Sequence, residues 1–192
     1  MIPIPTELRT ERLIMRPWRA EDASALHPIL VANWKHLGPW IPARVATPVP
    51  VPELELRLAG FGDDFASGRE FRYGLFAPDD HEVLGESGLY PRSATRRVPL
   101  SRASCIELGY WLRADLTGRG FVTEASRALV ALAETLPHLT HVEIRCDARN
   151  APSAAIPKRL GFTLATTLIE PATLPDEEPV QLQVWTLPLS PR

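Results

Sequence analysis

The stretch ELGYWLRADLTGRGFVTEA, from Glu107 to Ala125, joins an apolar strand pattern directly to a helix pattern. The turn at 116–120 therefore precedes a helix N-terminus, where amide N–H groups lack intrahelical partners and the helix dipole is positive. An anion is stabilised there, and Gly118 and Gly120 let the backbone come close to a phosphate. The apolar residues after the turn recur at three- and four-residue steps, as one buried helix face requires: Val122, Ala125, Leu129, Leu132 and Ala133.

Strand and helix patterns alternate along most of the chain. The unit 105–146 reads strand, helix, strand, and such a crossover joins parallel strands, so an α/β domain with a mixed sheet is predicted. Repeated prolines between 38 and 52 fix φ and remove donors, which predicts an extended segment over 38–51. We expect strands at 13–17, 71–76, 83–90, 105–112, 141–146, 162–168 and 180–187, helices at 21–34, 52–68, 120–136 and 150–160, and a polar loop at 170–179.

The composition limits the classes of protein to which this chain can belong. With 192 residues and 45% hydrophobic residues, the chain is expected to form one domain over residues 1–192. No apolar run reaches the roughly 20 residues of a membrane span, and the start MIPIP lacks the regions of a signal peptide, so a cytoplasmic location is expected. A net charge of −2 gives no electrostatic footprint for nucleic acid. Cys105 and Cys146 are expected to be buried thiols, because no ligand spacing indicates a metal.

The loop after Trp111 resembles the Gln/Arg-x-x-Gly-x-Gly/Ala loop of the GNAT acetyltransferase superfamily, which cradles the coenzyme's pyrophosphate. Further matches follow in the family's order, from about residue 8 to about residue 168. They resemble the branch that acetylates the N-termini of ribosomal proteins. These matches are the opening strand at 10–18, an acceptor-side loop at 33–40, a strand at 109–112, and a coenzyme-side helix marked by 150–153 and 160–162.

The resemblance implies a three-layer GNAT-like domain with a mixed, mostly antiparallel sheet of about seven strands and about four helices. The parallel strands at 105–112 and 141–146 would splay apart, so that the pantetheine of acetyl-CoA enters between them. Transfer to an amine would then be direct, with no covalent enzyme intermediate and no metal. The implied coenzyme contacts are Tyr110, Trp111, Leu112, Arg113, Thr117, Gly118, Arg119, Gly120, Phe121, Asn150 and Ser153.

The resemblance also implies catalytic and acceptor-side residues. Glu107 lies where a family base often sits, and Glu86 is the alternative base and an acceptor-side residue. Ser153 is expected either to donate to the leaving thiolate or to cap its helix. Asn150 is expected to contact pantetheine or, alternatively, to serve as a turn or cap residue. His36 and Trp40 are expected to line the acceptor pocket, or else to form an ordinary surface cluster.

Two positions depart from the family pattern. Asp115 stands where Gln or Arg is usual, so a carboxylate would lie near the pyrophosphate; Arg113 and Arg119 flank the loop and are expected to compensate. Pro157 lacks the N–H that would bond the Ser153 carbonyl. We therefore predict that the helix at 150–160 is kinked or starts late, leaving this carbonyl free for water or coenzyme.

The acceptor is left open at this point. A protein N-terminal α-amine and a small-molecule amine, such as an antibiotic or a polyamine, both suit the scaffold. A noncatalytic module that binds or senses acyl-CoA is the alternative of another class. A P-loop kinase or GTPase is not expected, because the loop at 118–120 lacks the Lys-Ser/Thr pair. No nucleic acid or membrane partner is expected, and a homodimer contact through the proline-rich connection or the last strand is left open.

Overall fold

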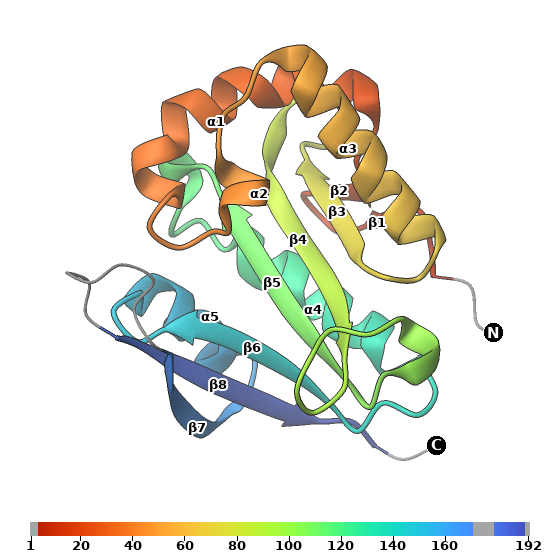
Figure 1. Cartoon of the computed structure of the whole chain (residues 1–192), viewed down its shortest axis with the longest axis vertical. Coiled ribbons are helices and arrows are strands. Elements are labelled where there is room, and N and C mark those ends of the chain that lie inside the picture. The colour runs from red at the N-terminus through yellow and green to blue at the C-terminus, as the bar shows by residue number, and fades with distance from the viewer. Residues whose placement is uncertain (1–3, 171–178, 191–192) are drawn as a thin grey trace.

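A computed structural model describes residues 4–170 and 179–190, which contain one mixed sheet. The strand order is β1-β2-β3-β4-β5-β6-β8-β7 (Figure 1). Of the neighbouring pairs only β5 and β6 are parallel, as the crossover pattern predicted. The strands are β1 (Leu8–Arg9), β2 (Ile14–Pro17), β3 (Phe71–Phe76), β4 (Val83–Arg92), β5 (Cys105–Leu112), β6 (His141–Asp147), β7 (Thr163–Glu170) and β8 (Val180–Pro188).

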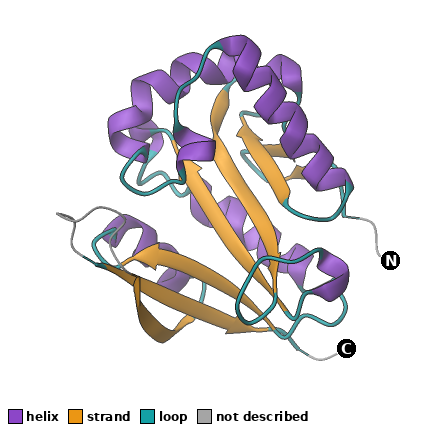
Figure 2. Cartoon of the chain, viewed as in Figure 1, coloured by secondary structure: helices purple, strands orange, loops and turns teal. Residues whose placement is uncertain are grey.

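Helices cover both faces of this sheet (Figure 2). In Figure 1, α1, α2 and α3 gather over one end of the sheet, α4 lies behind β4 and β5, and α5 lies beside β6. The helices are α1 (Ala23–Leu37), α2 (Ala43–Ala46), α3 (Val51–Ala66), α4 (Phe121–Ala133) and α5 (Ala151–Arg159), with 3-10 turns at Ala20–Asp22, Leu100–Arg102 and Ala114–Leu116. In the described residues, no helix has the length and apolarity to cross a membrane.

Two apolar clusters flank the sheet. The larger joins the α4 side of the strands and includes Leu108, Leu129 and Ile144. The smaller joins α1 and α3 to the other face, with Leu30 and Leu58 fully buried. Side chains alternate between the faces along each strand, so β5 contributes Leu108 to the first cluster and Trp111 to the second. The sheet is therefore buried from both sides where β3, β4 and β5 meet.

Most predicted elements lie where the patterns placed them, with two differences. The proline-rich segment is not extended throughout: α2 forms one turn after Pro42, whose fixed φ of −51° suits entry into a helix. The two-residue strand β1, too short to leave a pattern, was also not predicted. Both cysteines are free and buried, as predicted. Most of the predicted loop at 170–179 lies outside the described residues.

The two parallel strands pair only at one end. Register links Ile106 to Val142 and Glu107 to Glu143, and beyond these pairs β5 and β6 diverge (Figure 1). On its other edge β5 pairs with β4 over its whole length, from Cys105 to Leu112. Backbone groups of β5 beyond Glu107 on the β6 side are therefore available to a ligand between the strands.

Candidate active site

A cavity of about 800 Å³ opens where β5 and β6 diverge. Thirteen of the fifteen residues suggested by the sequence line it. They come from α1 and the segment after it, from β4 and β5, from the turn before α4, and from the N-terminal ends of α4 and α5. Arg113 and Arg119 do not; they line a second, smaller hollow beside Glu82 and Asp115. The thirteen are His36, Trp40, Glu86, Glu107, Tyr110, Trp111, Leu112, Thr117, Gly118, Gly120, Phe121, Asn150 and Ser153.

The turn before α4 has the backbone geometry of an anion site. Gly118 and Gly120 have φ of +76° and +86°, a left-handed conformation that favours glycine. A Cβ at Gly118 would meet nothing within 4 Å, so the requirement there is conformational rather than steric. In the part of the chain that the structure describes, the six successive amides at 118–123 have no acceptor. All of these residues except Arg119 line the cavity, at the positive end of the α4 dipole.

The N-terminal segment braces this turn. The Glu124 carboxylate, in the first turn of α4, accepts hydrogen bonds from the Thr10 hydroxyl, the Arg12 amide at 2.9 Å and Arg12 Nε at 2.7 Å. Arg12 Nη1 also donates to the Arg119 carbonyl at 3.0 Å, and its guanidinium lies 4.6 Å from the centre of the Phe121 ring. The segment that contains Thr10 and Arg12 therefore holds the turn before α4 in place.

Replacing Glu124 with glutamine is expected to lower the free energy of unfolding by about 1 kcal/mol at pH 7. The expected loss is modest because the Arg12 side chain is partly exposed and solvent screens its charge. Burial alone would raise the pKa of Glu124, but bonds from Thr10 and Arg12 outweigh it and lower the pKa from its usual 4.5. This contribution is therefore present above pH 4.5 and is lost as the pH falls through the folded-state value. Urea unfolding from pH 7 to pH 3 should show the two proteins converging in acid; a constant difference would contradict this account.

Asp115 is neutralised by a neighbour. Arg113 donates to it through Nε at 3.1 Å and Nη2 at 2.7 Å, and also reaches Glu82 at 2.6 Å. The hydrogen bond from Arg113 lowers the pKa of the Asp115 carboxyl. Arg113 therefore offsets Asp115 directly, on the side of the second hollow. Its suggested contact with the coenzyme has no support from its position, and the same holds for Arg119.

The helix α5 corrects one prediction. It starts at Ala151, directly after its cap, so a late start is wrong. Asn150 is the cap, since its side-chain oxygen accepts from the Ser153 amide at 3.1 Å. The Ser153 carbonyl, which Pro157 cannot bond, is not free either: the Tyr110 hydroxyl donates to it at 3.0 Å. The Ser153 hydroxyl in turn donates to the Tyr110 oxygen at 3.3 Å, so this hydroxyl is not the helix cap.

Two carboxylates face the cavity from adjacent strands. Glu86 on β4 is 3% exposed and accepts from Trp18 Nε1 and Arg72 Nη1, each at 2.7 Å. Glu107 on β5 accepts from Arg92 at 2.8 Å and from Arg97 at 3.2 Å. Glu86 is thus held on both oxygens inside the protein. Glu107 has longer bonds and lies at the point where β5 and β6 separate.

An arginine network beneath these carboxylates was not foreseen. Arg72 is buried and joins Glu86 to Glu70, and the charges of Glu86, Tyr90 and Glu70 raise its pKa despite the opposing effect of burial. Burial raises the pKa of Tyr90, whose ring lies between Arg72 and Arg97. Glu86 and Tyr90, four positions apart in the predicted strand 83–90, were the available signal, since side chains at this spacing share one face of a strand.

The end of the cavity where the acceptor is predicted to bind is formed by the last turn of α1 and the segment after it. His36 and Trp40 line it, and Trp40 is 40% exposed. Arg44 lines it too and bonds Glu70 at 2.8 Å. The cavity therefore extends from the turn before α4, past the gap between β5 and β6, to the last turn of α1 and the segment after it.

Comparisons with known proteins agree with this geometry. Residues 12–163 match the model of the acetyltransferase (GNAT) domain. The chain is 28% identical over 155 residues to the ribosomal protein uS5 alanine N-acetyltransferase of Escherichia coli K12, covering 81% of this chain and 77% of that protein. Solved structures that share the fold include two acetyltransferases. The Salmonella typhimurium acetyltransferase that modifies the N-terminal serine of L7/L12 has a TM-score of 0.76 at 18% identity, over 97% of this chain and 99% of that one.

The second is Mycobacterium smegmatis RimJ in complex with a CoA disulfide, with a TM-score of 0.74 at 22% identity, over 92% of this chain and 81% of that one. The family match spans most of the chain, and the fold, the parallel strand pair and the helix-terminal loop agree with it. This chain belongs to the GNAT acetyltransferase family.

Proposed function

We propose that this acetyltransferase transfers the acetyl group of acetyl-CoA to the α-amine of a protein N-terminus. The observation that carries the proposal is that one cavity contains both the unbonded amides at 118 and 120–123 and Glu107, with the gap between β5 and β6 joining them. The similarity to the Escherichia coli enzyme that acetylates an N-terminal alanine of ribosomal protein uS5 supports this acceptor class. Membership of an acetyltransferase family favours catalysis over a noncatalytic binding module.

The amides at 118–123 are assigned to the coenzyme pyrophosphate, because they combine unbonded donors with a helix dipole. The free edge of β5 around Tyr110 and Leu112 is assigned to the pantetheine amides, and Asn150 and Ser153 to the opposite wall. This path brings the thioester to the level of Glu107 and Gly109. Holding both reactants in line there contributes up to about 7–11 kcal/mol to the rate.

Glu107 is assigned the role of base, acting through one water. The amine nitrogen bonds to the acetyl carbon, the carbon–sulfur bond breaks, its electron pair goes to sulfur, and the amine proton passes by way of water to Glu107. An α-amine with a pKa near 8 needs about 1 kcal/mol to lose its proton at neutral pH, whereas a lysine needs roughly 4–5 kcal/mol. A carboxylate that is already paired with two arginines is suited to deprotonating an α-amine rather than a lysine.

Ser153 is assigned to the leaving thiolate: its hydroxyl, which donates to the Tyr110 oxygen in this structure, turns to donate to the sulfur instead. Replacing Ser153 with alanine removes a hydroxyl but keeps the backbone amide that Asn150 caps, so the helix start is preserved. Because a hydrogen bond to a charged group is worth about 1.5–3 kcal/mol, kcat is expected to fall at least tenfold. Steady-state kinetics would show this, with thermal unfolding as the check on the fold. An unchanged kcat would remove Ser153 from the chemistry.

The acceptor class can be tested with two peptides. Both begin with alanine and carry one internal lysine, and one of them has its α-amine blocked. The enzyme is incubated with acetyl-CoA and each peptide, and released CoA thiol is measured together with the site of acetylation by tandem mass spectrometry. We expect acetylation of the free α-amine and none of the blocked peptide. Equal reaction of both peptides, or reaction only with small amines such as spermidine, would refute the proposed acceptor.

The cytoplasmic location and the homodimer stay predictions, as does the extent of the domain over residues 1–192.

A further inference from the structure

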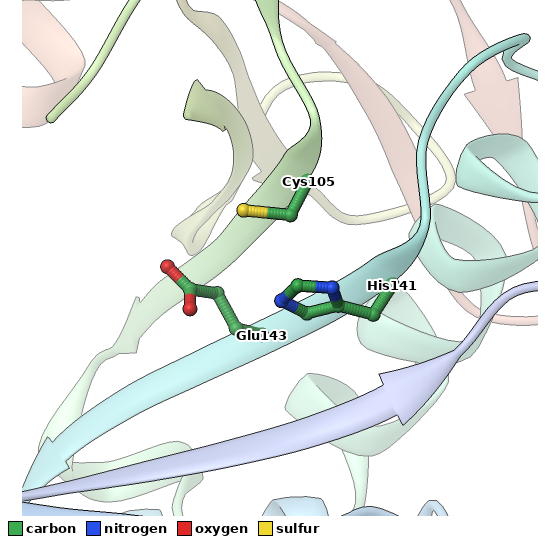
Figure 3. A group of neighbouring side chains, drawn as sticks. All are labelled: Cys105, His141 and Glu143. Atoms are coloured by element: carbon green, nitrogen blue, oxygen red, sulfur yellow. The ribbon is translucent and has the colours of Figure 1, made fainter. Parts of the chain in front are cut away.

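Three side chains of metal-ligand type meet at the paired end of β5 and β6. Parallel register places Cys105 beside His141 and brings both next to Glu143, and one potential ligand atom from each lies within 4.8 Å of the others. Figure 3 shows the thiol, the imidazole and the carboxylate directed toward one another. We propose that this cluster is a zinc site, separate from the acetyl-transfer cavity and not part of that reaction.

The tautomer of His141 follows from its neighbour. The Thr140 hydroxyl has one proton and donates it to the Ser104 carbonyl at 2.9 Å. At 2.8 Å from His141 Nδ1, the same oxygen must therefore accept, so Nδ1 carries the hydrogen. This leaves the lone pair on Nε2, the nitrogen that faces the cluster in Figure 3. A histidine oriented through its second nitrogen in this way is the usual form of a zinc ligand.

Glu143 is oriented as well. It is 4% exposed and bonds Arg145 Nε through Oε1 at 3.0 Å, while Oε2 has only a long 3.4 Å contact. Arg92 Nε lies 2.9 Å from Oε1 but makes no well-directed hydrogen bond to it, and it is a buried donor without a partner among the described residues. Both guanidinium groups thus lie against Oε1, while Oε2 has one long contact and keeps a lone pair that can ligate. Ligating carboxylates are commonly held by such outer hydrogen bonds.

Cys105 completes the set. Its sulfur makes a long bond of 3.8 Å to the Arg92 carbonyl and is buried. In a tetrahedral zinc site, with bonds of 2.0–2.3 Å, neighbouring ligand atoms lie about 3.5 Å apart. Side-chain rotations that move each ligand atom by less than about 1 Å bring the cluster to that spacing. Three protein ligands leave the fourth position for water.

The neighbouring charges set the affinity. Arg92 and Arg145 oppose a cation, although Arg92 is also paired with Glu107. With three ligands and two nearby guanidinium groups, we expect a dissociation constant in the micromolar range, weaker than that of a closed four-ligand site. A bound ion would join the strands exactly where only two residue pairs link them, and so would stabilise the closed end of the split.

The test uses full-length, untagged protein freed of metal with a chelator. Zinc chloride is titrated by calorimetry, and Co²⁺ is added separately to detect the near-ultraviolet charge-transfer band of a cobalt–thiolate bond. His141→Gln is the main variant, because His141 makes no ion pair with any described residue and is half-buried. Cys146→Ser is the matched control: it removes the other buried thiol, on the opposite face of β6. Cys105→Ser tests the cobalt band.

We expect one equivalent of zinc to bind, with at least tenfold weaker binding in His141→Gln and unchanged binding in Cys146→Ser. The cobalt band should be present in the wild type and in Cys146→Ser and absent from Cys105→Ser. The proposal is overturned if the wild type takes up no zinc at millimolar concentration. It is equally overturned if folded His141→Gln binds as tightly as the wild type, or if the cobalt band persists in Cys105→Ser.

Discussion

Replacing Gly118 with aspartate is expected to weaken acetyl-CoA binding about 100-fold, which corresponds to about 2.7 kcal/mol. Gly118 has a φ of +76° and open space around its Cα, so the new side chain fits but is strained. The larger effect is electrostatic, because a carboxylate near 4 Å from a pyrophosphate costs up to about 4 kcal/mol at an effective dielectric constant of 20. Isothermal titration calorimetry with acetyl-CoA measures the loss.

Gly161 provides the matched control for this variant. Its φ is +82°, a Cβ there would also meet nothing within 4 Å, and it lies outside the cavity. Gly161→Asp therefore introduces the same residue with similar backbone strain, and should bind acetyl-CoA as the wild type does. If both variants lose affinity equally, strain rather than the anion site explains the result; if Gly118→Asp binds normally, the loop does not hold the pyrophosphate.

Replacing Glu107 with glutamine is expected to lower kcat about 100-fold or more at pH 7, the usual contribution of a general base. Acetyl-CoA affinity should be unchanged, because the amides at 118–123 remain. The defect should shrink as the pH rises above about 8, where the α-amine loses its proton without help. The measurement is kcat against pH for both proteins with a peptide acceptor.

A purely structural role for Glu107 predicts something different. Loss of its bonds to Arg92 and Arg97 would lower activity by the same factor at every pH. A constant ratio of wild-type to variant kcat across the pH range would therefore exclude Glu107 as the base and direct attention to Glu86. Glu134→Gln, an exposed change at the end of α4, is the control for the substitution itself.

Local patterns were enough to predict most of the framework. The strands at 71–76 and 105–112 have the predicted bounds, and Gly68 ends its helix with a φ of +71°. Thirteen of the fifteen residues named from the motif line one cavity, as expected if a loop and two strand ends converge on one ligand. What the motif could not reveal was that Arg113 faces Asp115 and Glu82 rather than the cavity.

Contacts between strands were beyond the sequence. The pairing of Arg72 with Glu86, the bond from Tyr110 to Ser153, and the meeting of Cys105 with His141 all depend on register and on the crossing of elements. Periodicity indicates which face a residue occupies but not which residue lies opposite. The Cys–His–Glu cluster is invisible to ligand spacing for the same reason, since its members come from two strands joined by α4.

The measurement that tests the account most directly is a crystal structure of the protein with acetyl-CoA. We expect pyrophosphate oxygens within hydrogen-bonding distance of the amides at 118–123, pantetheine between β5 and β6, and the acetyl group beside Glu107 and Gly109. Coenzyme bound with its phosphates away from this turn, or with its thioester remote from Glu107, would contradict the account.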